Sequence, residues 1–92
     1  MPRVIITAQV EDLAKWEEGF RTHGDLFRRQ TITRPIGIGF GEGNEVALCL
    51  EPENLTTFME ILESPATAEA MAYDGVIRET VRVFVLDKEF QV

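Results

Sequence analysis

Residues 12–30 read DLAKWEEGFRTHGDLFRRQ, and this stretch carries the only tryptophan and the only histidine of the 92-residue chain. Five of its side chains recur at steps of three or four residues, the spacing of one helical face: Leu13, Trp16, Phe20, His23 and Phe27. The glycines at 19 and 24 each cost a helix up to about 1 kcal/mol against alanine, so we expect the helix to kink or loosen near His23. The pattern therefore predicts an amphipathic helix that turns an imidazole toward the interior.

The segments around this helix indicate β-strands. Residues 3–10 are rich in β-branched residues and apolar on both faces, which is typical of a central strand. Residues 31–40 alternate bulky and small side chains, and Pro35 cannot donate to a strand ladder, which places this strand at a sheet edge or a bulge. A turn at residues 42–44 then leads into a third strand, Glu45–Leu50, which closes a hairpin.

The second half of the chain predicts two helices and a last strand. Residues 55–63, capped by Asn54, form the first helix, and residues 66–73 form the second. The buried stripe expected on the first of these consists of Leu55, Phe58, Met59 and Leu62. Residues 77–86 are expected to form the last strand, and the mixed tail 87–92 is expected to reach beyond the subunit.

The order strand, helix, strand, strand, helix, strand predicts a single ferredoxin-like α+β domain over residues 1–92. In this βαββαβ fold a four-stranded antiparallel sheet carries its helices on one face. The other face keeps apolar side chains, and no remaining segment is available to cover it. We therefore expect a homodimer in which the sheets of two subunits face each other.

The composition limits the kinds of partner. Nine Lys and Arg stand against sixteen Asp and Glu, a net charge of -7. Binding to nucleic acid or to an anionic membrane depends on basic surfaces, so neither is an expected partner. No apolar run approaches the ~20 residues that span a bilayer, and no basic leader with an apolar core opens the chain. A single cysteine cannot form an internal disulfide, and we expect a cytoplasmic protein.

Candidate site residues lie mainly on the first helix. His23 is the candidate catalytic residue, because an imidazole takes and gives protons near neutral pH, which suits proton abstraction from an activated carbonyl compound. The alternative is a core histidine bonded to a backbone carbonyl or a carboxylate. Trp16, Phe20 and Phe27 are candidate walls for a planar substrate, although the same spacing is typical of plain core. Tyr73 is a candidate phenolic donor or, alternatively, a half-buried residue at the rim.

Three arginines share strand parity with large apolar residues: Arg34, Arg78 and Arg82. They are candidates to hold an anionic or enolate oxygen of a substrate, and Arg34 is included in the expected substrate site. The alternative is ion pairing with acids of a partner subunit, since Arg34 and Arg82 fall on expected edge strands. No metal or cofactor is expected, because one histidine and one cysteine with scattered carboxylates do not form a ligand set.

Short motifs along nearly the whole chain resemble those of the small dimeric α+β barrel proteins known as antibiotic-biosynthesis-monooxygenase-like or cyclase-like, many of which have no known function. The motifs are VEDLAKW at 10–16 with Phe20 and His23, NEV at 44–46, ESP at 63–65, AM at 70–71 and GV at 75–76. The resemblance implies a homodimer whose two sheets form a barrel, with a cleft between sheet and helices in each subunit. It also implies oxidation or cyclisation of aromatic, polyketide-like compounds without metal or organic cofactor. The chain departs from the family at Phe27, where many relatives have arginine, and at residues 78–80, which replace a Gly-Pro-Pro-like stretch.

Three functions are compatible with these features. The leading hypothesis is a cofactor-independent monooxygenase or cyclase that acts on an aromatic or polyketide-like carbonyl compound with His23 as general base. The alternatives are a non-catalytic ligand-binding or regulatory dimer, and a structural dimer with no ligand.

Overall fold

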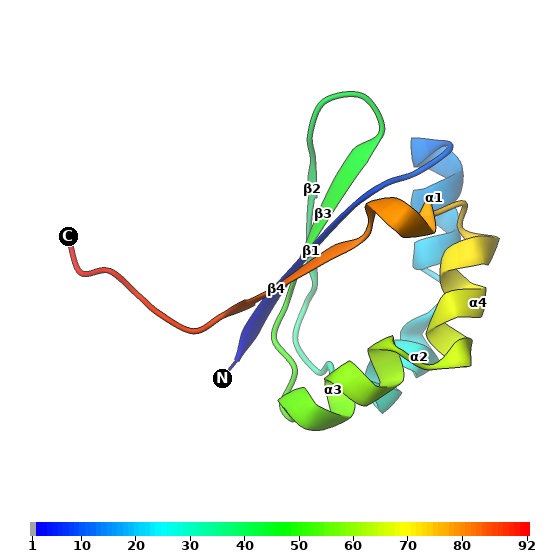
Figure 1. Cartoon of the computed structure of the whole chain (residues 1–92). Helices are drawn as coiled ribbons and strands as arrows, with labels where there is room; N and C mark the ends of the chain where they lie inside the picture. Colours follow the sequence, from blue (N-terminus) through cyan, green and yellow to red (C-terminus); the bar gives the residue numbers. More distant parts are fainter. Residues whose placement is uncertain (1) are drawn as a thin grey trace.

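The computed structural model describes residues 2–92 and shows one antiparallel sheet with helices on one face (Figure 1). The elements in chain order are β1 Arg3–Gln9, α1 Leu13–Phe20, α2 Gly24–Arg29, β2 Gly37–Phe40, β3 Glu45–Leu50, α3 Leu55–Leu62, α4 Pro65–Tyr73, the 3-10 helix η1 Arg78–Thr80, and β4 Arg82–Leu86. The strand order β2-β3-β1-β4 confirms the ferredoxin-like α+β fold and places β1 centrally, as its two apolar faces predict.

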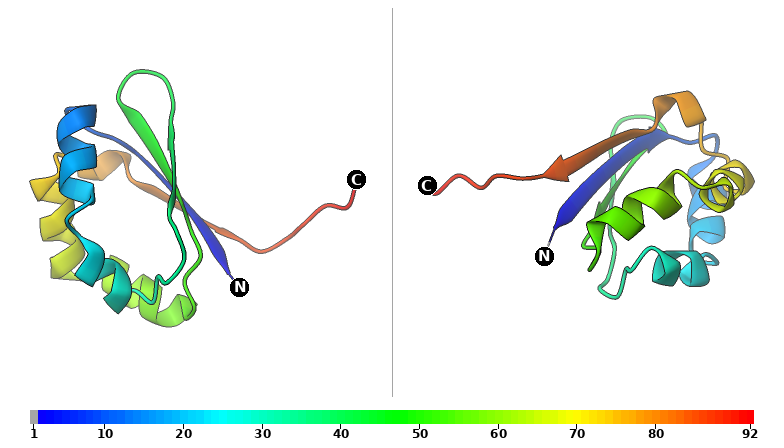
Figure 2. Two further views of the ribbon diagram at one scale, coloured as in Figure 1. Left: turned by 180° about the vertical axis from the view of Figure 1, so that it is seen from behind. Right: turned by 60° about the horizontal axis from the view of Figure 1, so that its bottom comes forward.

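Alternate side chains of each strand point to opposite faces of the sheet. Ile6 is in register with Leu48 on β3 and with Val83 on β4, so these three side chains lie on the face beneath the helices. The buried core gathers there in two adjoining clusters. The cluster near α1 contains Ala8, Val10, Trp16 and Val46, and the cluster near α3 contains Val4, Ile6, Ile32, Leu50 and Phe58. Figure 2 shows from two further directions that the helices stay on this one face.

Local capping fixes the helix starts, as predicted for the first and second helical segments. The Asp12 carboxylate accepts from the Lys15 backbone N–H at 2.9 Å, and the Asn54 side chain accepts from the Thr57 backbone N–H at the same distance. Each contact satisfies one of the donors that a helix leaves unpaired in its first turn.

The predicted continuous helix over residues 12–30 is divided into α1 and α2, and His23 lies at the junction. The Thr22 hydroxyl donates to the Gly19 carbonyl at 2.6 Å, the Thr22 backbone N–H donates to the same oxygen, and the His23 N–H bonds to Phe20. These three-residue bonds replace the four-residue bonds of a continuing α-helix. The expected loosening near His23 is therefore confirmed, and it turns α2 relative to α1.

Two predicted strands were too long. Within residues 31–40 only Gly37–Phe40 is a strand, because Thr31 has a left-handed φ of 66° and Ile32 makes just one bridge, to Pro52. Within residues 77–86, residues 78–80 form η1, where the Thr80 hydroxyl accepts from the Gln9 backbone N–H at 2.8 Å. A side chain thus occupies the place of a strand partner beside the end of β1.

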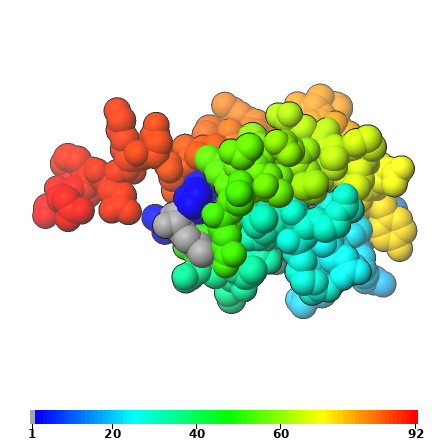
Figure 3. Space-filling view, turned by 90° about the horizontal axis from the view of Figure 1, so that it is seen from below, coloured from blue at the N-terminus to red at the C-terminus, as the bar shows by residue number. Residues whose placement is uncertain are grey.

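The sheet face opposite the helices is uncovered within the subunit (Figure 1). Ile5 is in register with Cys49 on β3 and with Phe84 on β4, and the Phe84 residue is 43% exposed. The tail after Leu86 projects away from the subunit (Figure 3), and Phe90 within it is 89% exposed. No helix among residues 2–92 has the length and apolar character needed to cross a membrane.

Candidate functional site

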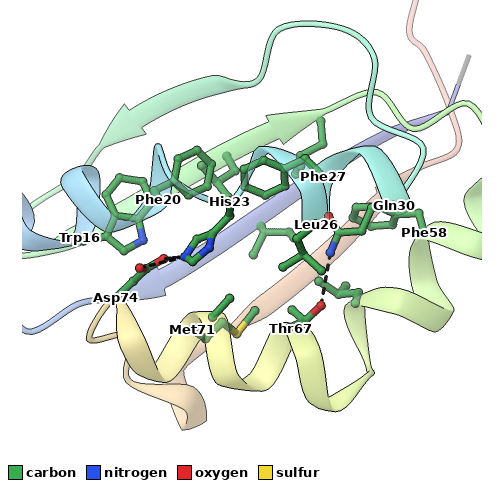
Figure 4. Close-up of a pocket in the computed structure, with 15 residues that line it drawn as sticks. Trp16, Phe20, His23, Leu26, Phe27, Gln30, Phe58, Thr67, Met71 and Asp74 are labelled. Atoms are coloured by element: carbon green, nitrogen blue, oxygen red, sulfur yellow. Dashed lines mark hydrogen bonds and ion pairs between the residues drawn. The ribbon is translucent and has the colours of Figure 1, made fainter.

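A cavity of about 80 Å³ lies between the sheet and the helices (Figure 4). Apolar side chains form most of its wall, including Ile6, Leu48 and Leu50 from the sheet. Four polar side chains also line it: His23, Gln30, Thr67 and Asp74. Because drug-sized ligands occupy pockets of roughly 300–1,000 Å³, this cavity must widen before it can admit an aromatic compound.

The structure brings four of the six predicted site residues to this cavity. Trp16, Phe20 and Phe27 line it together with His23. The Trp16 and Phe20 ring centroids lie 5.0 Å apart, and those of Phe20 and Phe27 lie 4.9 Å apart, so the three rings form a continuous aromatic wall.

The other two predicted site residues lie outside the cavity. Tyr73 is 68% exposed, and its ring meets His23 edge-on at a centroid distance of 6.3 Å. Arg34 is exposed in the segment before β2, where it lines a neighbouring groove and not the cavity. Of the other arginines considered, Arg78 is exposed on η1. Arg82 is in register with Thr7 on the uncovered sheet face, with its guanidinium over the Phe84 ring. Neither Arg78 nor Arg82 therefore lines the cavity, and pairing with acids of a partner subunit stays a prediction.

The feature that the sequence did not reveal is a contact between His23 and Asp74. The Nε2 atom of His23 lies 3.0 Å from Oδ1 and 2.9 Å from Oδ2 of Asp74 (Figure 4). The side chains are 18% and 4% exposed, respectively, so water screens the pair little. Asp74 follows the last residue of α4, where the helix dipole disfavours a negative charge. An acidic residue in that unfavourable position was the one local signal of a further role.

The contact determines which imidazole nitrogen carries hydrogen. An ionised carboxylate only accepts hydrogen bonds, so a neutral His23 must donate from Nε2 and leave Nδ1 as an acceptor. Within residues 2–92 Nδ1 of His23 has no hydrogen-bond partner. Every fully buried side-chain nitrogen and oxygen in this range does have a partner, so Nδ1 is not among the fully buried atoms. Its lone pair is therefore not fully enclosed and is free of any partner in this part of the chain.

Gly19 makes room for this contact. A Cβ atom at position 19 would lie 2.1 Å from Oδ1 of Asp74, so the carboxylate rests against the bare backbone of α1. The glycine that weakens the helix by propensity is therefore required by the close approach of Asp74.

Burial of the Asp74 carboxyl raises its pKa above the ordinary value, and the hydrogen bond and charge interaction with His23 offset this only in part. The carboxyl therefore takes up a proton more readily in the folded protein than in the unfolded chain.

A second polar pair lies at the other end of the cavity (Figure 4). Gln30 donates from Nε2 to the Thr67 hydroxyl oxygen over a long 3.4 Å, and the Thr67 hydroxyl donates to the Ile61 carbonyl at 2.5 Å. Both residues are buried. The long bond leaves the Gln30 amide available to turn toward an oxygen of a bound molecule. Among residues 2–92, no group of three or more His, Cys, Asp and Glu side chains is placed to hold a metal ion.

We predict that Gly19→Ala lowers the free energy of unfolding by about 1–3 kcal/mol, because the added methyl displaces Asp74 from His23. Gly24→Ala is the matched control, since its Cβ would lie 3.5 Å from the nearest atom, on the flexible Arg28 guanidinium. That change is expected to be neutral or to stabilise by up to about 1 kcal/mol. Urea unfolding measures both, and equal effects of the two substitutions would show that position 19 has no special need for glycine.

The raised pKa of Asp74 predicts a pH dependence with a definite sign. The folded protein binds this proton more tightly, so the carboxyl's contribution to stability is fully present below its unfolded pKa and is lost as pH rises through its folded pKa. The wild type should therefore gain stability relative to Asp74→Asn as the pH falls from neutral to about 4. Urea unfolding of both proteins across this range tests the slope. If the stability difference between wild type and Asp74→Asn shrinks as the pH falls, the interaction with His23 lowers the pKa of Asp74 more than burial raises it.

Comparisons with known proteins agree with this architecture. No protein-family model matches the sequence, and no curated protein matches it either. Among solved structures, a candidate antibiotic biosynthesis monooxygenase from Bordetella bronchiseptica superposes with a TM-score of 0.74 at 17% identity, over 97% of each chain. SnoaB from Streptomyces nogalater, a cofactor-independent oxygenase, gives 0.70 at 14% identity, over 99% of this chain and 95% of the other. A dimeric ferredoxin-like protein from an uncultured marine organism gives 0.56 at 15% identity, over 99% and 91%.

Identities this low establish the fold alone. The chain has the ferredoxin-like α+β fold found in these antibiotic-biosynthesis-monooxygenase-like structures, as the motifs along its sequence predicted.

Proposed function

We propose that this protein is a cofactor-independent monooxygenase or cyclase in which His23 removes a proton from an aromatic carbonyl compound. The observation that carries the proposal is the His23–Asp74 pair at the wall of an otherwise apolar cavity. Asp74 holds Nε2–H in place, so that Nδ1 receives the proton. Its negative charge then stabilises the imidazolium that forms.

The aromatic wall supports a planar substrate. Trp16, Phe20 and Phe27 offer ring faces and edges to a flat apolar compound, and Gln30 at the far end of the cavity offers an amide donor to a carbonyl oxygen. Loss of a proton beside such a carbonyl gives an enolate. This electron-rich anion can react with molecular oxygen, as in an oxygenase, or attack a second carbonyl of the same molecule, as in a cyclase. The fold shared with the oxygenase SnoaB is in keeping with this chemistry.

Substitution of His23 tests the catalytic role. Turnover of polyphenolic and quinol compounds, followed by oxygen uptake and absorbance, is expected to fall about 10²–10⁴-fold in His23→Ala, the usual contribution of a general base. Asp74→Asn should also lower the rate, because it removes the charge that stabilises the imidazolium. Glu60→Ala, on the exposed face of α3, is the control and should retain the wild-type rate. Equal rates for wild type and His23→Ala would remove the catalytic role, and ligand binding without turnover in either would identify a non-catalytic binding protein.

We also propose that the protein works as a homodimer in which the uncovered faces of two sheets meet. On this face the side chains of Ile5, Cys49 and Phe84 are in register, and Gly37 of β2 continues their row. Gly39 ends the neighbouring row beside Ala47, so neither position has a side chain that would hold a second sheet apart. One similar solved structure is described as dimeric, which supports the proposal.

The dimer is tested by sedimentation at micromolar concentration. The wild type should sediment as a dimer, and Phe84→Glu should shift it to monomer, because a charged group would replace the aromatic ring and lose its water against the partner sheet, a cost that the nearby Arg82 guanidinium does not remove. Thr56→Glu, an exposed change on α3, is the matched control and should remain dimeric. A wild-type monomer under these conditions would contradict the proposed pairing.

A further inference from the structure

An open groove of about 480 Å³ lies beside the cavity. The end of α1 and α2 form one side of it, and the segment that leads into β2 forms the other. Figure 2 shows this segment returning from the end of α2 to the sheet. The apolar side chains that line the groove are Phe20, Phe27, Ile32, Ile36 and Ile38. Its volume falls within the range of small-molecule sites, which the cavity alone does not reach.

Every charged residue that lines this groove is an arginine: Arg21, Arg28 and Arg34. This is contrary to the overall balance of the chain, in which acids outnumber bases and the net charge is -7. The present partners of the three guanidinium groups are carboxylates that do not line the groove: Glu17 for Arg21, Asp25 for Arg28, and Glu51, at 3.9 Å, for Arg34. Exposed ion pairs of this kind contribute no more than about 1 kcal/mol. An anion placed in the groove can therefore compete for the same guanidinium groups.

The groove and the cavity share one wall. Phe20 and Phe27 line both, with ring centroids 4.9 Å apart. A rotation of the Phe27 side chain would join the two spaces, and a flat ring could then take its place against Phe20. A ligand seated in this way would have its acidic group among the arginines and its ring end directed toward His23.

We infer that this groove binds the carboxylate of an amphipathic aromatic acid, and that Arg21, Arg28 and Arg34 select acidic ligands over neutral ones. A guanidinium group pairs a planar carboxylate through two parallel hydrogen bonds, which gives it a geometric preference for this group. The inference rests on the proposed function in one respect, because the same compound would present its ring end to His23 as substrate.

Calorimetric titration with 2-naphthoate and 2-naphthamide tests this selectivity, because the two probes have the same ring and differ in charge. Wild type is expected to bind the carboxylate at least about tenfold more tightly than the amide at low ionic strength, a difference of about 1.4 kcal/mol. The preference should shrink in roughly 0.5 M salt, where charge interactions are screened. Arg28→Gln should weaken naphthoate binding and leave naphthamide binding unchanged, and the triple change with Arg21→Gln and Arg34→Gln should abolish the preference.

Arg29→Gln is the matched control, since Arg29 is an exposed neighbour on α2 that does not line the groove. Equal affinities for the two probes, no binding of either, or a preference that survives the triple substitution would overturn the inference. His23→Ala separates it from the proposed function. If His23→Ala loses turnover but wild type shows no preference for the carboxylate probe, the groove inference alone is refuted. If wild type prefers the carboxylate probe but shows no turnover, the catalytic proposal alone is refuted.

Discussion

The candidate site depends on one buried contact, in which the carboxylate that follows α4 meets the imidazole between α1 and α2. Three local features make it possible. The Thr22 hydroxyl bonds to a backbone carbonyl and ends α1 early, which places His23 at the junction. Gly19 leaves the space that the carboxylate fills, and Gly75, with φ of 77°, lets the chain turn away immediately after Asp74. Each of these features weakens regular helical structure locally, and together they hold a polar pair at the edge of an apolar core.

This arrangement is unfavourable for the charged form of Asp74, because the carboxylate loses contact with water. Its burial raises the pKa of the carboxyl, so the folded state is less stable at neutral pH than it would be with a neutral group of the same shape. Structures retain strained or desolvated groups mainly where function needs them, and a desolvated carboxylate beside a histidine stabilises positive charge on the ring more strongly than an exposed one.

Local patterns predicted most of the fold but only one partner, His23, of the buried polar pair. Caps at Asp12 and Asn54 and the bounds of β3 follow from short-range signals, and the structure agrees with them. The overlong strands at 31–40 and 77–86 arose because β-branched composition shows where a chain can extend, whereas tertiary contacts decide whether it pairs. The aromatic seam identified His23 as inward-facing. Its partner lies 51 residues away, and no spacing rule connects two residues that only the assembled sheet and helices bring together.

The placement of charge around the cavity argues for a ligand with two distinct ends. An anionic group near His23 would face the Asp74 carboxylate across a poorly hydrated space, where like charges repel strongly. The arginines lie on the groove side of the Phe20–Phe27 partition, and the Asp74 carboxylate lies on the cavity side. A molecule with its acid in the groove and its neutral ring toward His23 satisfies both constraints, because its charge meets guanidinium groups while only the ring end approaches the base. Under the proposed function, the proton would leave a neutral position of the ligand, and the resulting enolate would lie beside the imidazolium formed in the same step.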